Sequence, residues 1–249
     1  MIKFFRKIRQ NLLSENKFTK YLIYAVGEIV LVVIGILIAL QFNNLNNQSQ
    51  LRKLEIKYLK EIATNLESDS ADIAFNIQFN EIRLRSAEMV LKGLSENETY
   101  SDTLNHYFGT LLYTTRSVVN FSAYETLKSR GLEIISNDSL RKMITHLYSF
   151  SYHNAIDFEK QDDHAMQYEV IIPAVVDKLL FHPNEDMRMA MRSAEPKDFE
   201  ALKTDDEFKN VLMLNVELRA YILNMYRGLA TKVAECRSRI QSELEKLEQ

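Results

Sequence analysis

Residues 21–42, YLIYAVGEIVLVVIGILIALQF, decide the fold, because Leu, Ile and Val fill the centre of this run. At a rise of 1.5 Å per residue, a helix of this length spans roughly 33 Å, about the hydrocarbon thickness of a bilayer. Tyr21 and Tyr24 stand where interfacial aromatic residues are expected. A cleaved signal peptide is the competing interpretation, but the run is long and no small-residue cleavage site follows Leu40. We therefore expect a retained transmembrane helix.

The charges on either side of this run predict its orientation. Residues 1–20 contain six Lys or Arg and one Glu, whereas residues 43–51 carry no charge. The positive-inside rule then places residues 1–20 in the cytoplasm as a basic tail. Residues 2–13, IKFFRKIRQNLL, have the pattern of an amphipathic helix on the inner leaflet, and a disordered tail is the alternative. Everything after residue 42 is then expected to be extracytoplasmic, which means periplasmic, with the anchor in the inner membrane, if the source is a Gram-negative bacterium.

Composition favours an all-α fold. Six glycines and three prolines in 249 residues are too few for a turn-rich β fold. The net charge is −3, with the positive excess in the tail, so the folded body has no basic surface of the kind that binds nucleic acid. Cys236 is the only cysteine, which excludes an internal disulfide. We expect it to be a small buried apolar residue.

Two long amphipathic helices are predicted beyond the membrane run. Apolar residues recur at three- and four-residue steps from Leu51 to Leu94 and again from Phe208 to Leu247. The two helices have equal length, about forty residues, and should therefore pair antiparallel. The intervening stretch 43–50, NNLNNQSQ, has neither Gly nor Pro, so the membrane helix is expected to continue through it. This gives a stalk helix over 43–95 and a helical bundle over 96–249.

Shorter signals predict the remaining elements. Ser122 with Glu125, and Thr204 with Glu207, match capping boxes that would open two helices. The other expectations are a helix over 101–115, a helix end at Gly131, a third long helix capped by Asn137 or Asp138 and kinked or ended by Pro173, and a break at 182–186, HPNED.

Two stretches resemble an uncharacterised family of bacterial membrane proteins. They are FFRKIRQNLLSENKFTKYLIYAVGEIVLVVIGILIALQFNNLNN (residues 4–47) and SAYETLKSRGLEIISNDSLRKMITHLY (residues 122–148). The family is common in Bacteroidota, and its members have one membrane helix and about the length of this chain. Leu45 stands where the family pattern has a tryptophan. The resemblance implies the topology described above and a bacterial source, and it implies no activity.

Glu28 is the unusual residue of the membrane run. A carboxylate at this depth is costly unless it is protonated, paired, or facing protein or water. Ala25, Gly35 and Ala39 fall on the same helix face, and the last two form a small-xxx-small pair that lets another helix approach. In one interpretation Glu28 couples protons, as the membrane acid of single-anchor motor subunits does. In the other it is an assembly contact or extends toward the cytoplasmic face.

The third long helix carries the only metal candidates. His146, His153, Asp157 and His164 fall close to one face, and His153 with Asp157 could share a metal. The spacing matches no zinc signature, so His153, Asp157 and His164 are weak candidates, and a structural stripe explains them equally well. The acidic stretch DFEKQDD at 157–163 is interpreted as a solvated face. No catalytic motif is present, and no cofactor is implied.

The sequence therefore predicts a non-enzymatic, membrane-anchored helical scaffold or interaction protein. Its expected partners are the lipid bilayer and either a second copy or another membrane protein, held through the face that contains Gly35 and Ala39. One alternative is an ion-coupled transmembrane subunit that uses Glu28. Another is a periplasmic ligand-sensing bundle that signals through a partner.

Overall fold

The computed structural model describes residues 18–95, 98–182 and 193–249. The predictions for the basic tail and its amphipathic helix therefore fall almost entirely outside the described residues. The chain divides into two compact units, Met1–Leu54 and Glu55–Gln249. Helix α2 (Phe18–Gly93) contributes its first part to one unit and its second part to the other. The helix is unbroken through residues 43–50 and ends at Gly93, as the sequence predicts.

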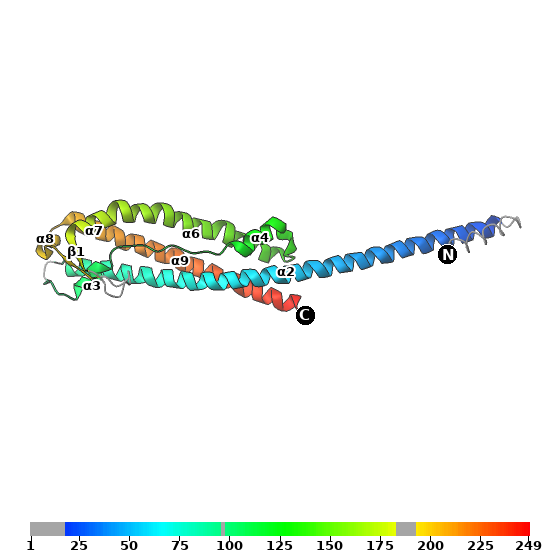
Figure 1. Ribbon diagram of the computed structural model, residues 1–249, viewed down its shortest axis with the longest axis horizontal. Helices are drawn as coiled ribbons and strands as arrows, with labels where there is room; N and C mark the ends of the chain where they lie inside the picture. The colour runs from blue at the N-terminus through cyan, green and yellow to red at the C-terminus, as the bar shows by residue number, and fades with distance from the viewer. Residues whose placement is uncertain (1–17, 96–97, 183–192) are drawn as a thin grey trace. The chain divides into compact units, whose positions relative to one another are not determined.

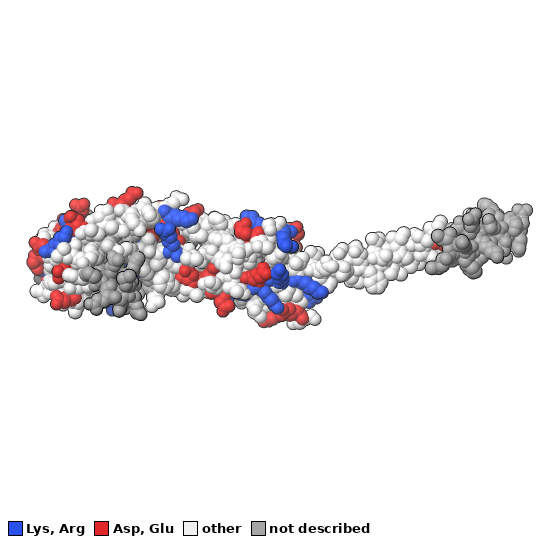
Figure 2. Space-filling model, viewed as in Figure 1, with Lys and Arg blue, Asp and Glu red and all other residues white. Residues whose placement is uncertain are grey.

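In the first unit, α2 exposes its apolar side chains. Leu31 is 65% exposed, Ile34 46% and Leu37 58%, and none of the apolar stretch is buried. Figure 2 shows the corresponding stretch without Lys or Arg on the visible face. Within the described residues, α2 is the one helix that is long and apolar enough to cross a membrane.

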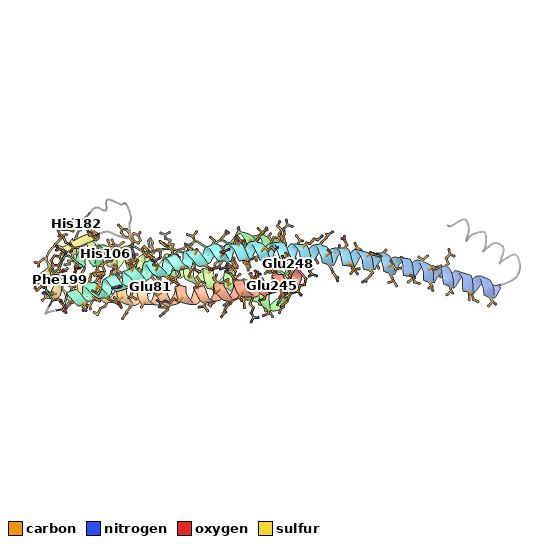
Figure 3. All side chains as sticks on the ribbon, turned by 90° about the horizontal axis from the view of Figure 1, so that it is seen from below. Glu81, His106, His182, Phe199, Glu245 and Glu248 are labelled. Atoms are coloured by element: carbon orange, nitrogen blue, oxygen red, sulfur yellow. The ribbon has the colours of Figure 1, made fainter. Side chains whose placement is uncertain are left out.

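The second unit is an all-α bundle in which α2 pairs with α9 (Asp206–Leu247). Three ion pairs fix the direction of this pairing: Lys60 with Glu248 (2.6 Å), Glu67 with Arg237 (3.5 Å) and Glu81 with Arg227 (2.7 Å). Residue numbers rise along α2 as they fall along α9, so the two helices are antiparallel, as predicted. Glu81 and Glu248 mark two levels of this pairing in Figure 3.

A third long helix, here called the middle helix, runs over residues 138–178. It consists of α5 (Asp138–His146), η2 (Leu147–Ser151), α6 (Tyr152–Phe158), η3 (Glu159–Asp163), η4 (Met166–Ile171) and α7 (Ile172–Lys178), and the three η segments are π-helical. Of the two outcomes predicted at Pro173, a kink or an end, the end is not observed, because α7 continues to Lys178. A π-helical turn pairs each N–H with the carbonyl five residues earlier, and these turns end at Ile171. Pro173, which has no N–H, therefore stands where the hydrogen-bond pattern changes from π-helical to α-helical.

The helix predicted over 101–115 is much shorter than expected. Helix α3 covers only Leu104–Gly109, where the hydroxyl of Thr110 donates to the carbonyl of His106 (3.1 Å). Tyr113 has a φ of +78°, which no right-handed helix accepts. Residues 111–121 then form an extended segment, here called the strap, which runs from α3 to α4 (Figure 1). Because the strap returns the chain along the bundle, α2 and the middle helix run parallel, and both are antiparallel to α9.

The helix caps are partly as predicted. Asn137 caps α5 by accepting from the N–H of Leu140 (3.2 Å), and Gly131 ends α4 (Ser122–Arg130) with a φ of +114°, which favours glycine. The Ser122–Glu125 capping box is wrong, because the Ser122 hydroxyl donates to the Asn120 side chain (2.7 Å) instead.

The Thr204–Glu207 capping box is also wrong. Thr204 ends the short helix α8 (Phe199–Lys203), which the sequence did not predict, and Asp205 caps α9 by accepting from Phe208 N–H (2.9 Å). Aspartate is among the residue types preferred at the N-cap. Asp198 caps α8, and Asp205 takes the N-cap position of α9 that was predicted for Thr204.

A small hairpin lies at the α3 end of the bundle. Strands β1 (Leu179–His182) and β2 (Ser193–Pro196) pair antiparallel, with Leu179 opposite Pro196. The break predicted at 182–186 lies mostly outside the described residues. The hairpin packs with α3 and α8 over an apolar core whose buried members include Val90, Phe108, Leu111, Ile171, Val175, Ala194, Leu202 and Phe208. This core closes the end of the bundle.

Candidate functional site

The predicted packing face of the first unit is open. Gly35 and Ala39 are exposed, and Ala25 and Glu28 are half-buried. A Cβ atom added at Gly35 would meet no atom within 4 Å, so the surface there has room for the backbone of another helix.

The predicted metal candidates do not converge. His153, Asp157 and His164 are all exposed. A ring nitrogen of His153 lies 2.8 Å from the carbonyl oxygen of Tyr148, and His164 stacks on Tyr168 with ring centroids 4.4 Å apart. Nowhere in the described ranges do three His, Cys, Asp or Glu side chains come together as a metal site. His146 stacks on Phe150 in the same way.

Cys236 is buried, as the sequence predicts. It is fully shielded on α9, and burial raises the pKa of its thiol to about 12. The thiolate is therefore disfavoured, and Cys236 acts as an apolar side chain.

The interior of the bundle contains an unexpected series of buried polar residues. Along the middle helix every fourth residue is buried: Ser151, Ala155, Glu159, Asp163, Gln167, Ile171 and Val175. In an α-helix, residues four apart drift by about 40° per step, so they would leave one face within a few turns. The π-helical turns η3 and η4 hold more residues per turn and keep this repeat facing inward. The interpretation of residues 157–163 as a solvated face is therefore wrong for Glu159 and Asp163.

Asp163 and Arg219 form the central polar layer. Arg219 donates to Asp163 (2.7 Å), and both side chains are 1% exposed. Arg219 also donates to Asn80 of α2 (2.7 Å), and Thr114 of the strap donates to the other oxygen of Asp163. One layer thus joins all three long helices and the strap. A buried pair with its remaining hydrogen bonds made fixes the register of the helices.

Two further carboxylates hold the strap. Glu159 accepts from the backbone N–H of Ser117 (2.9 Å) and from the hydroxyl of Tyr226 (2.8 Å). Asp69 accepts from Asn120 N–H (3.1 Å) and from the hydroxyl of Tyr152 (2.8 Å). Burial raises the pKa of the Asp69 carboxyl, and these hydrogen bonds oppose that shift. The strap is therefore bound by side chains of α2 and the middle helix, and it forms no sheet.

Arg83 is the second buried guanidinium. It is 1% exposed, its Nε donates to the carbonyl of Leu112 (3.2 Å), and its guanidinium carbon lies 3.2 Å from the ring centre of Phe79. Burial, and to a smaller extent the positive charge of Arg219, together lower the pKa of Arg83 to about 9.

A groove of about 350 Å³ opens between α6 and α9 on the outside of the bundle. Its walls carry Phe150, Phe158 and Tyr221, and the last two rings are 4.8 Å apart. Phe150 is 53% exposed and Tyr221 57%. Lys232 is the one charged residue of the lining, and its ammonium donates to Ser151 (3.2 Å). We call this feature the aromatic groove.

A second groove, between α2 and α9, has a different lining. Glu81, Arg85, Glu88 and Arg227 surround it, so charged side chains dominate there. A groove lined by charged side chains is typical of a solvated bundle surface. Three aromatic rings on one open face are characteristic of a contact surface. No sequence pattern predicts the aromatic groove, because its residues come from two helices with separate patterns.

The buried polar layers have a signal in the sequence, which is the continuation of the inward helical steps through polar residues. On α2 the steps that place Ile62 and Leu66 inward continue through Asp69, Asn76, Asn80 and Arg83, all of which are buried. A search restricted to apolar residues passes over such positions. On the middle helix the buried residues from Ser151 to Val175 recur at every fourth position, and an α-helical period would not keep so long a run on one face.

Comparison of the chain with family models, with curated proteins and with solved structures gave no match in any of the three.

Proposed function

We propose that this chain is a non-enzymatic interaction protein, anchored by the apolar part of α2, whose bundle binds a partner protein through the aromatic groove. The observation that carries the proposal is the open cluster of Phe150, Phe158 and Tyr221 beside Lys232. Exposed aromatic side chains on a rigid scaffold contribute most of the affinity in protein contacts. The surrounding helices are fixed by the buried polar layers, so the groove is already formed before binding.

The lining of the aromatic groove defines the chemistry of the occupant. Its rings and Leu229 call for an apolar side chain, and Lys232 calls for a carboxylate next to it. Ser151, Asn154 and Asn224 add hydrogen-bonding groups at the edge. We infer a segment of another protein that presents an apolar residue and an Asp or Glu one helical turn apart.

The proposal places the bundle in the periplasm and the anchor in the inner membrane. The support is the excess of Lys and Arg before the apolar run, together with the open face at Gly35 and Ala39, which favours oligomers through the anchor. Protease added to intact spheroplasts should remove a C-terminal tag and leave an N-terminal tag. Protection of the C-terminal tag would refute this orientation.

Site-specific photocrosslinking in native membranes tests the groove. A photoreactive amino acid replaces Tyr221 in the full-length chain, and we expect one discrete adduct, identified by mass spectrometry. The same amino acid at Phe75, which is 59% exposed on α2 and outside the groove, is the matched control and should give no such adduct. Lys232→Glu should lower the yield at position 221 several-fold, because it reverses the one charge of the lining.

Two results would contradict the proposal. If positions 75 and 221 give the same adducts, the groove has no selective partner. If the adduct at position 221 has twice the mass of the chain, a second copy occupies the groove, and the inferred partner is wrong.

A further inference from the structure

Arg83 presents an unsatisfied charge inside the bundle. Its side chain is 1% exposed, and Nη1 is fully buried with no hydrogen-bond partner. An arginine keeps its proton in almost every protein environment, so this site cannot readily become neutral. A buried charge without a counter-charge is among the costliest features a fold can contain. Something must compensate Arg83.

The neighbouring charges do not supply the compensation. Asp163 is already paired with Arg219, and the nearest charge that acts on Arg83 is the positive one of Arg219. Over the described residues, no carboxylate forms a salt bridge with Arg83. The other buried carboxylates, Asp69 and Glu159, accept from tyrosine hydroxyls, so Arg83 and Arg219 are two cations with one paired carboxylate between them. The ring of Phe79 and the Leu112 carbonyl offset part of this excess, but neither carries a full negative charge.

A second buried group without a partner lies on the middle helix. The carbonyl of Leu112 accepts from Arg83, and the carbonyl of the preceding residue, Leu111, accepts from Asn215 (3.4 Å). Asn215 accepts in turn from Arg219, the partner of Asp163, and Gln167 lies four residues beyond Asp163 on the inward repeat of the middle helix. Gln167 is fully buried, and neither its amide nitrogen nor its amide oxygen has a partner. Fewer than one in ten buried polar groups are left in this state, so Arg83, which also carries a full charge, requires a reason.

We propose that the bundle binds a small monovalent inorganic anion, of the size of chloride, against Nη1 of Arg83. The anion balances the second cation of the layer and accepts the hydrogen bonds that the protein leaves unmade. A halide fits this position better than phosphate, because one charge costs less to desolvate than two, and better than a carboxylate, because it needs less room in a closed interior. The binding is independent of the aromatic groove and of the proposed partner.

Thermal unfolding of the full-length protein in detergent tests the proposal. Circular dichroism is recorded at constant ionic strength while chloride is replaced by gluconate, which is too large to enter. Binding to the folded state alone should raise Tm by about 5–10 °C at a hundredfold excess of chloride over its Kd. Arg83→Met should abolish this dependence, whereas Arg85→Met, on the exposed side of the same helix, should leave it intact.

A direct measurement covers the case in which Arg83→Met fails to fold. The ³⁵Cl NMR line should broaden in the presence of the wild-type protein and sharpen when bromide displaces chloride. Equal Tm values in chloride and gluconate, with no broadening beyond that of a denatured sample, would overturn the proposal and leave buried water as the occupant. A chloride dependence that persists in a folded Arg83→Met variant would place the anion elsewhere and would also overturn it.

Discussion

The two parts of helix α2 share one continuous backbone, but the first exposes its apolar side chains and the second buries them. In the first unit apolar side chains such as Leu37 point outward and are exposed on every side. In the second unit the inward face holds apolar residues such as Leu66 together with charged ones such as Asp69 and Arg83. The first arrangement is stable only in an apolar surrounding, whereas the second creates its own interior. Exposure of the hydrophobic residues, more than their number, distinguishes a membrane segment from a bundle helix.

The difference also shows which residues determine specificity. An apolar segment in lipid has no hydrophobic force that selects one neighbour over another, so small residues and rare polar groups decide its contacts. The bundle has strong hydrophobic burial, but burial alone permits several registers. Its polar layers, each joining different helices and the strap, permit only one.

The largest effect is expected from the central pair of the bundle. Arg219→Met leaves Asp163 buried without its counter-charge and should cost about 3–5 kcal/mol of the free energy of unfolding. Denaturant unfolding of the full-length protein in detergent, followed by circular dichroism, measures the loss. The exposed pair of Arg227 with Glu81 is the control, and Arg227→Met should cost at most about 1 kcal/mol.

A further variant separates charge from packing at this pair. Combining Arg219→Met with Asp163→Leu removes both charges, so stability should return toward that of the wild type. Equal losses for the single and the double variant would show that the layer acts through shape alone and that its charges do not fix the register.

Truncating one leucine in each part of α2 compares the two environments directly. Leu66 is fully buried, so Leu66→Ala should destabilise the bundle by about 2–5 kcal/mol. Leu37 is 58% exposed in the first unit, and Leu37→Ala should leave unfolding of the bundle unchanged. The same denaturant titration measures both variants. A loss of comparable size at Leu37 would mean that the apolar segment packs against the bundle.

The smallest effect concerns a single thiol. The pKa of Cys236 is raised to about 12 by burial, so at pH 8 the folded protein holds almost no thiolate at this position. Labelling by a maleimide should therefore be slow in the native protein and fast in denaturant, where an ordinary thiol has a pKa of about 8.5. Rapid labelling of the folded protein would show that this part of α9 opens readily. Mass spectrometry of the labelled chain gives the rate.

The long elements of the fold followed from the sequence, because their signals are repeated many times. Some forty residues of three- and four-residue steps predicted each of the two paired helices, which are the second part of α2 and α9. Their antiparallel pairing followed from their equal length. The short elements were less predictable. Ser122 and Thr204 matched capping boxes, but Asn120 accepts from the N–H of Ser122, and Asp205 caps α9 in place of Thr204. One residue of difference decides such a choice, and a pattern cannot resolve it.

The candidate sites were harder still. The histidines of the middle helix were predicted to share a face by α-helical spacing, and the π turns change that spacing. The same turns bring Glu159, Asp163 and Gln167 inward, where acidic composition had indicated solvent. The aromatic groove depends on how Phe158 meets Tyr221 across two helices, which is a property of the packing.

The parallel course of α2 and the middle helix has a consequence for biosynthesis. Asp163 and Glu159 receive hydrogen bonds from the strap, which is translated before them, but Arg219 and Tyr226 lie on α9, which is translated after them. Until α9 emerges from the ribosome, two carboxylates face an incomplete apolar interior. The nascent bundle therefore cannot close early, and its last helix adds stability and polar satisfaction in a single cooperative step.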